Sequence, residues 1–523
     1  MNAYLLLNIA GSIVPEQEIV TFGNQCQTYS QLMNRTSLLA AALASYGIGH
    51  GDRVGIITTN CPESVEAFFA SFQIGAAIVP INYRAKADEL AFMLKDSGVK
   101  VLIVEQRYAE MLQPLLAETG IESVICIGGA HQIGPDYEEV LKRVSEPLFD
   151  FADVDSNDLA VLLYTSGTTS RPKGVMITND QLTTYVMGHS EAADGTPKGS
   201  SIICVPSYHV AGATSICNCI YSGRRLILLR QFEADAWLHA VEKEKATHSF
   251  LVPTMLKRVM DHHNFQSTDL SNLESLSYGA APMPFPVIRR AIDLFPPTTN
   301  FANAFGMTET TSTVSVLGPD DHKLTGTPKE INKKIRRLAS VGKPLPGVEI
   351  MILDDENKPV ETNTIGNVYV CTERAMKGYW NRPDASNETI VNGWINTKDM
   401  GWLDEDGYLF LSGRSSDMII RGGENISPQE IEDVLLEHPE VSDVAVIGTP
   451  SLEWGEEVMA VVVSNNPEVP PKVEELAEFC RKKLASFKCP AKIEFVQELP
   501  RTSSGKILKR DLREQFIGET VKP

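Results

Sequence analysis

Short runs of apolar residues alternate with longer helical patterns over much of residues 28–300. Apolar residues three or four positions apart indicate helices at residues 31–46 and 64–74. Runs of the kind found in buried strands occupy residues 53–57, 77–80, 100–104, 123–127 and 159–163. Strands that alternate with helices form parallel sheets covered by helices, so this pattern predicts an α/β fold.

The pattern changes near residue 340. From 340 to 412, short apolar strands at 349–353 and 366–371 are separated by Gly, Pro and Asp turns. This part of the chain therefore predicts a small β-rich subdomain.

A short polar segment, residues 414–417, separates the β-rich part from a new block. A strand at 418–420 is followed by a helix that begins at Pro428, with Ser427 as its N-cap and Glu430 three residues after the cap. We expect an N-terminal domain over residues 1–413, a hinge at 414–417 and an α+β C-terminal domain over 418–523.

The segment 164–174 (YTSGTTSRPKG) combines six hydroxyl or glycine residues in a row with Arg171 and Lys173. Small side chains let the backbone approach a polyanion, and N–H groups, hydroxyls and cations can bind phosphate oxygens. The same composition is typical of a mobile surface loop. A Walker A sequence is excluded because Gly174 follows Lys173 where that motif needs Ser or Thr. The position directly after a buried strand suits a nucleotide phosphate.

The length and charge of the chain limit what it can be. A chain of 523 residues exceeds what one core usually supports, so two or more domains are expected. The net charge of −20 argues against a general nucleic-acid binder, and any site for a polyanion must be locally positive. Residues 471–523 offer such a region, with 12 Lys or Arg against 8 Asp or Glu.

Cysteine spacing and hydropathy indicate the compartment. The nearest two of the nine cysteines, Cys217 and Cys219, lack a second pair for zinc, and we expect nine reduced thiols. Residues 4–14 are apolar without a basic start, which predicts an amphipathic helix rather than a signal peptide. No run reaches the roughly 18 to 20 apolar residues of a membrane span. The sequence thus predicts a cytoplasmic protein without stable membrane insertion.

Five segments resemble, in order and spacing, the motifs of the adenylate-forming superfamily, which contains acyl-CoA synthetases, peptide-synthetase adenylation domains and luciferases. The first is the loop 164–174, although Ser170 stands where many members carry Gly. The others are FGMTET at 305–310, NTKD and WLDEDGY at 396–399 and 402–408, the stretch from GR at 413–414 to residue 432, and PRTSSGK at 500–506. The resemblance covers nearly the whole chain.

The resemblance implies an architecture and a reaction. The architecture is a large N-terminal domain of two parallel, helix-covered sheets plus a β-rich subdomain, followed by a small mobile α+β domain. The reaction is that of an AMP-forming acid–thiol ligase that uses ATP, Mg²⁺ and coenzyme A. A carboxylate attacks the α-phosphate to give an acyl-adenylate and pyrophosphate, and a thiol then displaces AMP. Because carboxylate and ATP repel each other, the first step needs positive charge and magnesium at the phosphate.

The resemblance also assigns roles to individual residues. Lys506 acts as the catalytic cation, Glu309 holds Mg²⁺ with Thr165, Asp399 accepts from both ribose hydroxyls and Arg414 donates to the ribose. Outside these motifs, Asp399 is equally a turn residue and Arg414 a surface charge. Further nucleotide-binding residues are implied at Ser166, Gly167, Thr168, Thr169, Lys173, Gly279, Ala280, Ala281, Asn303, Ala304, Phe305, Gly306, Met307 and Thr308.

The acyl pocket is implied around YHVAG at 208–212, where His209 gates the site with a catalytic role. Without the motif, His209 is equally a core histidine. The pocket is assigned to His209, Val210, Ala211, Val252, Thr254, Tyr278, Gly279, Ala304, Met307 and Thr311. None of these offers a cation for a second substrate carboxylate, and small side chains leave room. We therefore expect a medium-chain fatty, alicyclic or aromatic acid.

The thiol step is implied at a glycine turn that lines the CoA tunnel after the small domain rotates, although the same residues suit a plain β-turn. The tunnel is assigned to Gly422, Gly423, Glu424, Trp454, Phe487 and Lys488. The hinge position holds Ser416, where relatives often have Asp or Lys.

Other functions share these motifs. A stand-alone adenylation enzyme would load a carrier-protein thiol, and the carrier would be a separate partner, since no carrier-like Asp-Ser segment follows in the chain. A luciferase-like oxygenase and a non-catalytic nucleotide sensor are further alternatives, and intact Lys506, Glu309 and Asp399 count against the sensor. The expected partners are a small carboxylic acid, ATP and CoA, with no nucleic acid; homodimers are common among relatives.

Overall fold

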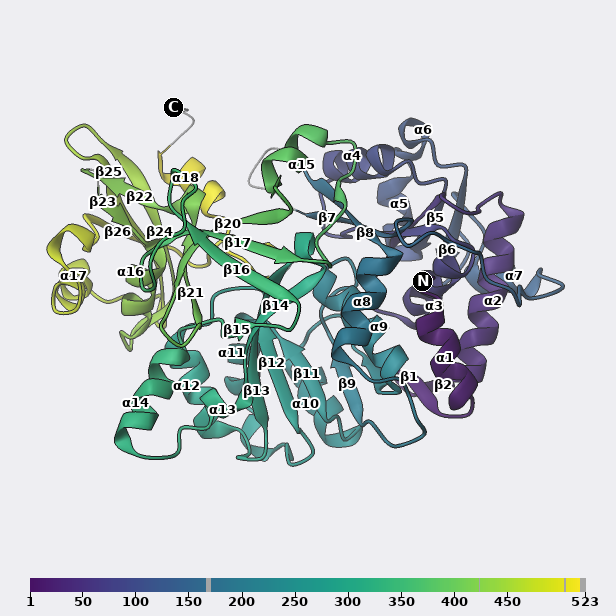
Figure 1. The fold of residues 1–523 in the computed structure, drawn as a ribbon, viewed down its shortest axis with the longest axis horizontal. Helices are drawn as coiled ribbons and strands as arrows, with labels where there is room; N and C mark the ends of the chain where they lie inside the picture. The colour runs from purple at the N-terminus through teal and green to yellow at the C-terminus, as the bar shows by residue number, and fades with distance from the viewer. Residues whose placement is uncertain (166–170, 423, 503–504, 518–523) are drawn as a thin grey trace.

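The computed structural model describes residues 1–165, 171–422, 424–502 and 505–517. Four sheets and their helices extend along the long axis, with the N-terminal part on the right and the C-terminal part on the left in Figure 1. The predicted α/β class, with a large N-terminal part and a smaller C-terminal part, is confirmed.

The first large sheet is mostly parallel. Its nine strands are, in spatial order, β15 (Lys343–Pro344), β14 (Ser312–Leu317), β13 (Asn300–Met307), β12 (Ser275–Gly279), β11 (His248–Leu251), β9 (Ser200–Ile203), β10 (Arg225–Leu228), β1 (Glu18–Phe22) and β2 (Gln25–Thr28). The strands from β13 to β1 are parallel, and the edges add antiparallel pairs. These antiparallel edges were not predicted.

The second large sheet carries most of the predicted strands. Its order is β18 (Gly378–Tyr379), β8 (Lys173–Thr178), β7 (Leu159–Thr165), β4 (Ala77–Pro80), β3 (Arg53–Ile57), β5 (Val101–Glu105) and β6 (Ser123–Ile127). The strands from β7 to β6 are parallel, whereas β8 and β18 are antiparallel additions. Every residue of β4 is buried, as expected of a strand with both faces covered.

Helices pack between and outside the two sheets. One shared core holds apolar side chains of α1 (Leu5–Ile13), α2 (Tyr29–Ser45), α3 (Pro62–Gln73), α8 (Asn179–His189) and α9 (Val210–Ser222). The outer face of the first sheet is covered by α10 (Ala234–Lys243), α11 (Pro253–Met260) and α12 (Phe285–Leu294), and that of the second by α4 (Ala87–Ser97). The helices predicted at 4–14, 31–46 and 64–74 correspond to α1, α2 and α3.

The β-rich part forms a small antiparallel sheet of its own. It contains β16 (Val348–Leu353), β17 (Gly366–Thr372), β20 (Trp394–Leu403), β19 (Ile390–Val391) and β21 (Leu409–Arg414). Its apolar side chains pack against Val314 of β14 and Phe305 of β13. The subdomain is thereby joined to the sheet that carries the FGMTET motif.

The C-terminal part is an α+β unit. Its sheet comprises β23 (Glu424–Ile426), β22 (Ile419–Arg421), β25 (Gly455–Ser464), β24 (Val441–Ser451) and β26 (Lys492–Phe495), and its helices are α16 (Pro428–Leu436), α17 (Val473–Arg481) and α18 (Lys509–Ile517). A 3₁₀ turn, η4 (Ser415–Asp417), lies between β21 and β22. The domain boundary at 414–417 stays a prediction.

The start of α16 differs from the expected capping box. Ser427 occupies the N-cap position, but its hydroxyl donates to the carbonyl of Ser412 at 2.5 Å instead of capping the helix. Glu430 binds Lys488 at 2.7 Å. The prediction of a capping box, in which the Ser427 and Glu430 side chains cap the start of the helix, was wrong because both side chains have other partners.

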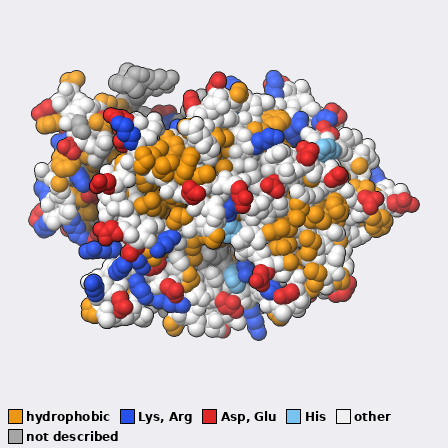
Figure 2. Space-filling model, viewed as in Figure 1, with side chains coloured by type: hydrophobic (Ala, Val, Ile, Leu, Met, Phe, Trp, Pro, Cys, Tyr) orange, Lys and Arg blue, Asp and Glu red, His pale blue; other side chains and the backbone are white. Residues whose placement is uncertain are grey.

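Other sequence predictions concern thiols and the surface. All nine cysteines are free. No helix among the described residues has the length and apolar character to cross a membrane. Figure 2 shows basic side chains gathered at the lower left, where α14 (Pro328–Arg337) carries Lys329, Lys333, Lys334, Arg336 and Arg337 and has no buried residue. The negative net charge is therefore unevenly spread, and one positive region lies outside the predicted tail.

Candidate active site

The predicted phosphate loop connects two antiparallel strands of the second sheet. Thr165 ends β7 and pairs with Lys173, the first residue of β8, with its hydroxyl 3.4 Å from the Lys173 carbonyl oxygen. The ammonium of Lys173 lies 5.1 Å from the ring centroid of Tyr379. The predicted residues Ser166, Gly167, Thr168 and Thr169 lie outside the described part of the chain.

Glu309 lies in η3 (Thr308–Thr310), directly after β13, and is 8% exposed. Its Oε1 accepts a hydrogen bond of 2.7 Å from the Tyr379 hydroxyl, and its carbonyl accepts from the Met376 N–H at 2.8 Å. Burial raises the pKa of Tyr379, and the neighbouring carboxylate raises it further. Tyr379 therefore stays a neutral donor that orients Glu309.

Sequence reasoning missed Tyr379. The residue sits in β18, which pairs with β8 through Tyr379 and Val175, so the segment lies beside the exit of the phosphate loop. Its only sequence signal is an aromatic pair after Gly378, whose φ of 143° favours glycine. One ring thus lies between the loop lysine and the predicted magnesium ligand.

Asp399 and Arg414 face each other across β20 and β21. The Arg414 Nε lies 2.8 Å from Asp399 Oδ1, and Nη1 donates to the Thr397 carbonyl at 2.9 Å. Burial raises the pKa of Asp399, while Arg414 and Lys506 oppose that rise. The pair presents an acceptor and a donor together, as the predicted ribose contact requires.

Lys506 follows a tight turn against the N-terminal part. Gly505 has φ +82°, and a Cβ there would lie 3.2 Å from Thr254 Oγ1 and 3.5 Å from a Val252 methyl group. The Thr502 N–H donates to the Lys506 carbonyl at 2.7 Å and closes the turn. The loop from the C-terminal part therefore touches two residues predicted to line the acyl pocket.

The Lys506 side chain lies within electrostatic range of the other motifs. Burial lowers its pKa and Arg414 lowers it further, whereas Asp399 and Glu309 raise it. The side chain also keeps exposed surface, so it borders space that water can enter. Four segments of the chain thus place two carboxylates, a guanidinium and an ammonium in one electrostatic neighbourhood.

His209 is the N-cap residue of α9. Burial lowers its pKa to about 4, helped by the charges of Lys506 and Arg84. His209 is therefore neutral at pH 7 and stands near the C-terminal lysine. Sequence reasoning also missed Arg84, which is exposed beside Tyr83 and has no distinguishing motif in the chain.

The other predicted acyl-pocket residues do not all present side chains to one space. Val210 and Ala211 are half-buried in the first turn of α9. Tyr278 is fully buried, and its hydroxyl lies 2.9 Å from His322 Nε2, so only its backbone is left for a pocket role. Thr311 is fully buried, and its hydroxyl donates to the Arg374 carbonyl at 2.7 Å.

Close strand packing fixes the backbone at Gly279 and Ala304, two of the predicted nucleotide-binding residues. A Cβ on Gly279 would lie 2.1 Å from the carbonyl oxygen of Ala304, so β12 and β13 need glycine there. Asn303 turns its amide toward the Ser340 carbonyl at 3.2 Å. Of the remaining predicted residues, Phe305, Gly306 and Met307 end β13, whereas Ala280 and Ala281 follow β12 and Thr308 follows β13.

The predicted CoA residues form a separate group on the C-terminal sheet. The Gly422 N–H donates to the Trp454 carbonyl at 2.7 Å, and the Arg421 guanidinium lies 5.3 Å from the Trp454 ring and donates to the Phe487 carbonyl at 2.8 Å. Lys488 binds Glu430. Glu424 is exposed at the start of β23, and Gly423 lies outside the described residues. No hydrogen bond or ion pair within the described ranges joins this group to Lys506 or Glu309.

The predicted hinge residue, Ser416, is exposed in η4. Its neighbour Asp417 binds Arg513 of α18 at 3.0 Å. This ion pair ties the hinge segment to the helix that follows the Lys506 loop.

The residues at Glu309 fit a magnesium ion only with help from a substrate. Within the described ranges, no three His, Cys, Asp or Glu side chains gather as a metal site. Mg²⁺ is commonly bound by one or two carboxylates together with substrate phosphates. One buried carboxylate beside a phosphate loop matches that mode of binding.

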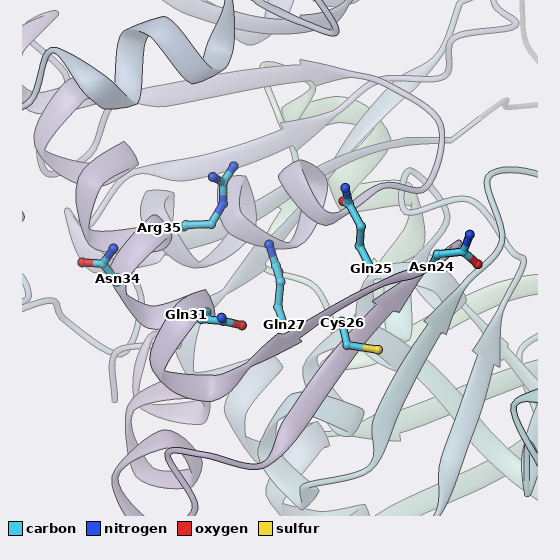
Figure 3. A pocket seen from close by; sticks show the side chains of 7 residues that line it. All are labelled: Asn24, Gln25, Cys26, Gln27, Gln31, Asn34 and Arg35. Atoms are coloured by element: carbon cyan, nitrogen blue, oxygen red, sulfur yellow. The ribbon is translucent and has the colours of Figure 1, made fainter.

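One hollow lies away from the predicted site. It has a volume of about 540 Å³ beside β2 and α2, and its lining residues, drawn in Figure 3, are Asn24, Gln25, Cys26, Gln27, Gln31, Asn34 and Arg35. None of the predicted site residues lines it.

Family models and known proteins match the chain over almost its whole length. The model described as AMP-binding enzyme matches residues 11–380, and that of the AMP-binding enzyme C-terminal domain matches residues 430–506. A feruloyl-CoA synthase from Amycolatopsis sp is 34% identical over 512 residues, which cover 96% of each chain.

Two further similar proteins have names that indicate a different acyl acceptor or a different acid. The fatty acid–[acyl-carrier-protein] ligase ScoC of Streptomyces coeruleorubidus is 31% identical and covers 95% of this chain and 92% of its own. The crystal structure of the anthranilate CoA ligase AuaEII with anthranoyl-AMP is similar with a TM-score of 0.89 and 26% identity, over 99% of this chain and 97% of that one.

Proposed function

This chain belongs to the AMP-binding enzyme family, and on that premise we propose that it is an AMP-forming acyl-CoA synthetase. It converts ATP, a carboxylic acid and CoA into acyl-CoA, AMP and pyrophosphate through an acyl-adenylate. The observation that carries this proposal is the approach of Lys506, from the C-terminal loop, to Asp399, Glu309 and Arg414 of the N-terminal part.

In the first half-reaction, positive charge must meet the α-phosphate as the substrate carboxylate attacks it. Lys506 supplies this charge from a loop anchored by Thr502 and Gly505. Burial and Arg414 lower the pKa of Lys506, whereas the carboxylates of Asp399 and Glu309 favour its charged form, which is the form that this role needs.

Glu309 and Thr165 would hold Mg²⁺, which when bound supplies positive charge to the phosphates. Tyr379 fixes one oxygen of Glu309 and leaves the other oxygen for the cation. Asp399 and Arg414 orient the ribose, so the α-phosphate stays in line with the acid.

His209 borders the route between acid and thiol. Because it is neutral at pH 7, it packs beside an acyl group without adding a third cation to Lys506 and Arg84. In the second half-reaction, the group at Gly422 and Trp454 would have to approach the adenylate, which requires rotation of the C-terminal part about residues 414–417.

The acid is proposed to be aromatic, alicyclic or medium-chain. Half-buried Val210 and Ala211 and buried Val252 offer apolar lining of small volume. The proteins that are 34% and 26% identical to this chain are named for ferulate and anthranilate, which are both aromatic acids. Among the three classes of acid, their names favour an aromatic substrate.

The test is AMP release from ATP and Mg²⁺, with and without CoA, across short, medium, long, cyclohexane-type and aromatic acids. CoA-dependent AMP formation with one group of acids is the expected result. Absence of both AMP release and pyrophosphate exchange with every acid would contradict the proposal.

A second candidate is a ligase that loads a carrier protein. The similarity to ScoC over 95% of this chain favours it as the alternative. Pyrophosphate exchange without CoA turnover, together with acylation of an added phosphopantetheinylated carrier, would select this candidate over the synthetase.

A further inference from the structure

Arg374 is the only lysine or arginine among the buried side chains of the described residues, with 4% of its surface exposed. Its Nε lies 3.3 Å from the Thr372 hydroxyl, and Nη1 lies 3.3 Å from Nε2 of His189. Its Nη2 is buried and has no hydrogen-bond partner. None of the ion pairs within the described ranges includes this guanidinium.

Two partly buried arginines of the chain show the more usual arrangement, in which the guanidinium binds a carboxylate. Arg35 binds Glu66 at 2.6 Å, and Arg225 binds Glu244 at 2.9 Å. A buried cation without an anion is costly, because the charge has lost its water without gaining a counter-charge. An anion that arrives from outside the chain would therefore bind favourably at Arg374.

His189 does not supply that anion. Its Nδ1 lies 2.6 Å from the Tyr185 carbonyl oxygen, so Nδ1 carries the proton and Nε2 accepts from Arg374. Burial lowers the pKa of His189, and the charge of Arg374 lowers it further. A neutral His189 thus orients the guanidinium without supplying a counter-charge. The charge of the neighbouring Glu373 favours the charged form of Arg374, but the two side chains, both among the described residues, form no ion pair.

Arg374 lies next to the region predicted to hold the acyl group. Its carbonyl accepts from Thr311, two residues after Glu309. The strand that follows, β14, contacts both neighbouring helices, because Ser312 lies 3.4 Å from Thr214 of α9 and Thr313 lies 3.4 Å from the Tyr185 hydroxyl of α8.

Two neighbouring helices border this region, and the last turn of one of them carries His189. Figure 1 shows α8 and α9 side by side, and α9 begins at the residue after His209. At Gly188, in the last turn of α8 and next to His189, an added Cβ would meet no atom within 4 Å. Gly188 and His189 are both exposed, so the last turn of α8 borders solvent beside the Arg374–His189 pair.

We propose that Arg374, oriented by His189, is an anion subsite at the far end of the acyl region, and that the acid carries a second carboxylate that binds there. This inference rests on the proposed function, in which the first carboxylate is the one activated. A guanidinium fork with one free Nη2 matches a carboxylate, and the bond is charge-assisted. The cation that the predicted pocket residues lack comes from the segment after β17.

If Arg374 only stabilises the fold, its replacement should have a different effect. The guanidinium lies 5.6 Å from the Tyr185 ring and stands at the C-terminal end of α8, and both positions favour a cation. In that case, removal of the charge would lower stability and would not alter the choice of acid.

The test compares acids in matched pairs, in which a carboxylate replaces the terminal methyl group or the para hydrogen. Suitable pairs are hexanoate with adipate, octanoate with suberate, and benzoate with terephthalate. We expect the wild-type kcat/KM for at least one diacid to exceed that of its monoacid by about tenfold or more. Arg374→Met should abolish this preference and keep the best monoacid within about threefold. Arg225→Met, which removes another partly buried arginine, is the matched control and should leave the preference unchanged.

Two results would overturn the subsite: a wild-type preference for the monoacid in every pair, or an equal change for both acids of a pair in Arg374→Met. If a variant is too inactive for kinetics, a thermal-shift measurement with the free diacids tests binding instead. Binding should raise the Tm of the wild type and not that of Arg374→Lys or Arg374→Met. Because this readout needs no turnover, failure of the subsite is distinguished from failure of the proposed synthetase reaction.

Discussion

Replacement of Tyr379 by Phe would isolate one hydrogen bond of the proposed magnesium ligand. In the structure, the Tyr379 hydroxyl donates to Glu309 Oε1 at 2.7 Å, and no other side chain of the described residues donates to that carboxylate. Glu309 is 8% exposed, so water replaces the lost donor poorly. The substitution removes one oxygen atom and keeps the ring that packs against Lys173.

The magnitude follows from the type of bond. A hydrogen bond to a charged group contributes about 1.5–3 kcal/mol. If the full free energy of this hydrogen bond contributes to the transition state by orienting Glu309, its loss slows the first half-reaction by about tenfold to 150-fold, since about 1.4 kcal/mol corresponds to a factor of ten. Because the bond acts through the metal ligand, the concentration of Mg²⁺ needed for half-maximal rate should also rise.

The assay is acid-dependent ATP–pyrophosphate exchange over a range of Mg²⁺ concentrations. The matched control is Tyr137→Phe, since Tyr137 is also a buried tyrosine that donates to a buried carboxylate, Glu66, at 2.7 Å. Both variants should lose similar stability, and only Tyr379→Phe should lose exchange. Exchange rates and Mg²⁺ dependence of Tyr379→Phe within twofold of wild type would refute the orienting role.

Three further outcomes are expected. Lys506→Ala should slow adenylation by about 10² to 10³, the range seen when one contact that stabilises transition-state charge is removed. Hydrolysis or thiolysis of a supplied acyl-adenylate should stay within about tenfold of the wild-type rate. Equal losses in both steps would contradict the proposed role of Lys506 in adenylation. Gly279→Ala should lower the free energy of unfolding by about 1–3 kcal/mol, because the new Cβ would lie 2.1 Å from a carbonyl oxygen of the neighbouring strand, whereas Gly49→Ala, with no atom within 4 Å, should change Tm little. The free energy of unfolding should fall as the pH drops from about 6.5 towards 4. His209 and His248 have a pKa of about 4 in the folded protein and about 6.5 when unfolded, so the unfolded state binds more protons over this range. A Tm that does not change over this range, or that falls equally steeply in His248→Gln, would contradict this prediction.

Much of the fold could be predicted because burial dictates the pattern. The strands β3, β4 and β6 match their predicted ranges, since parallel strands covered on both faces must be continuously apolar. The antiparallel strand β8, which lies between β18 and β7, escaped prediction, because KGVMIT lacks both a continuous apolar run and a clear alternation. The capping box at Ser427 failed for another reason: a hydrogen bond to Ser412, from a distant strand, competes for the same hydroxyl.

The candidate site was predictable only as far as motifs mark it. The motifs give Lys506, Glu309, Asp399 and Arg414, and the structure draws their side chains into one electrostatic neighbourhood. The residues that support those groups from other segments leave no trace in the sequence. Tyr379 is an ordinary aromatic residue until β18 pairs with β8, and Arg374 is an ordinary basic residue until it is found to be buried.

The distance along the chain between Glu309 and Lys506 has a consequence during protein synthesis. Translation at about 5–20 residues per second delivers Lys506 roughly 10–40 s after Glu309. By then the last strand of the first large sheet, β15, has long been made. If the proposed roles hold, a ribosome-bound chain would display the predicted nucleotide-binding residues of the first sheet before the proposed catalytic lysine exists, and ATP or acid bound there would stabilise the nascent N-terminal part before the first turnover.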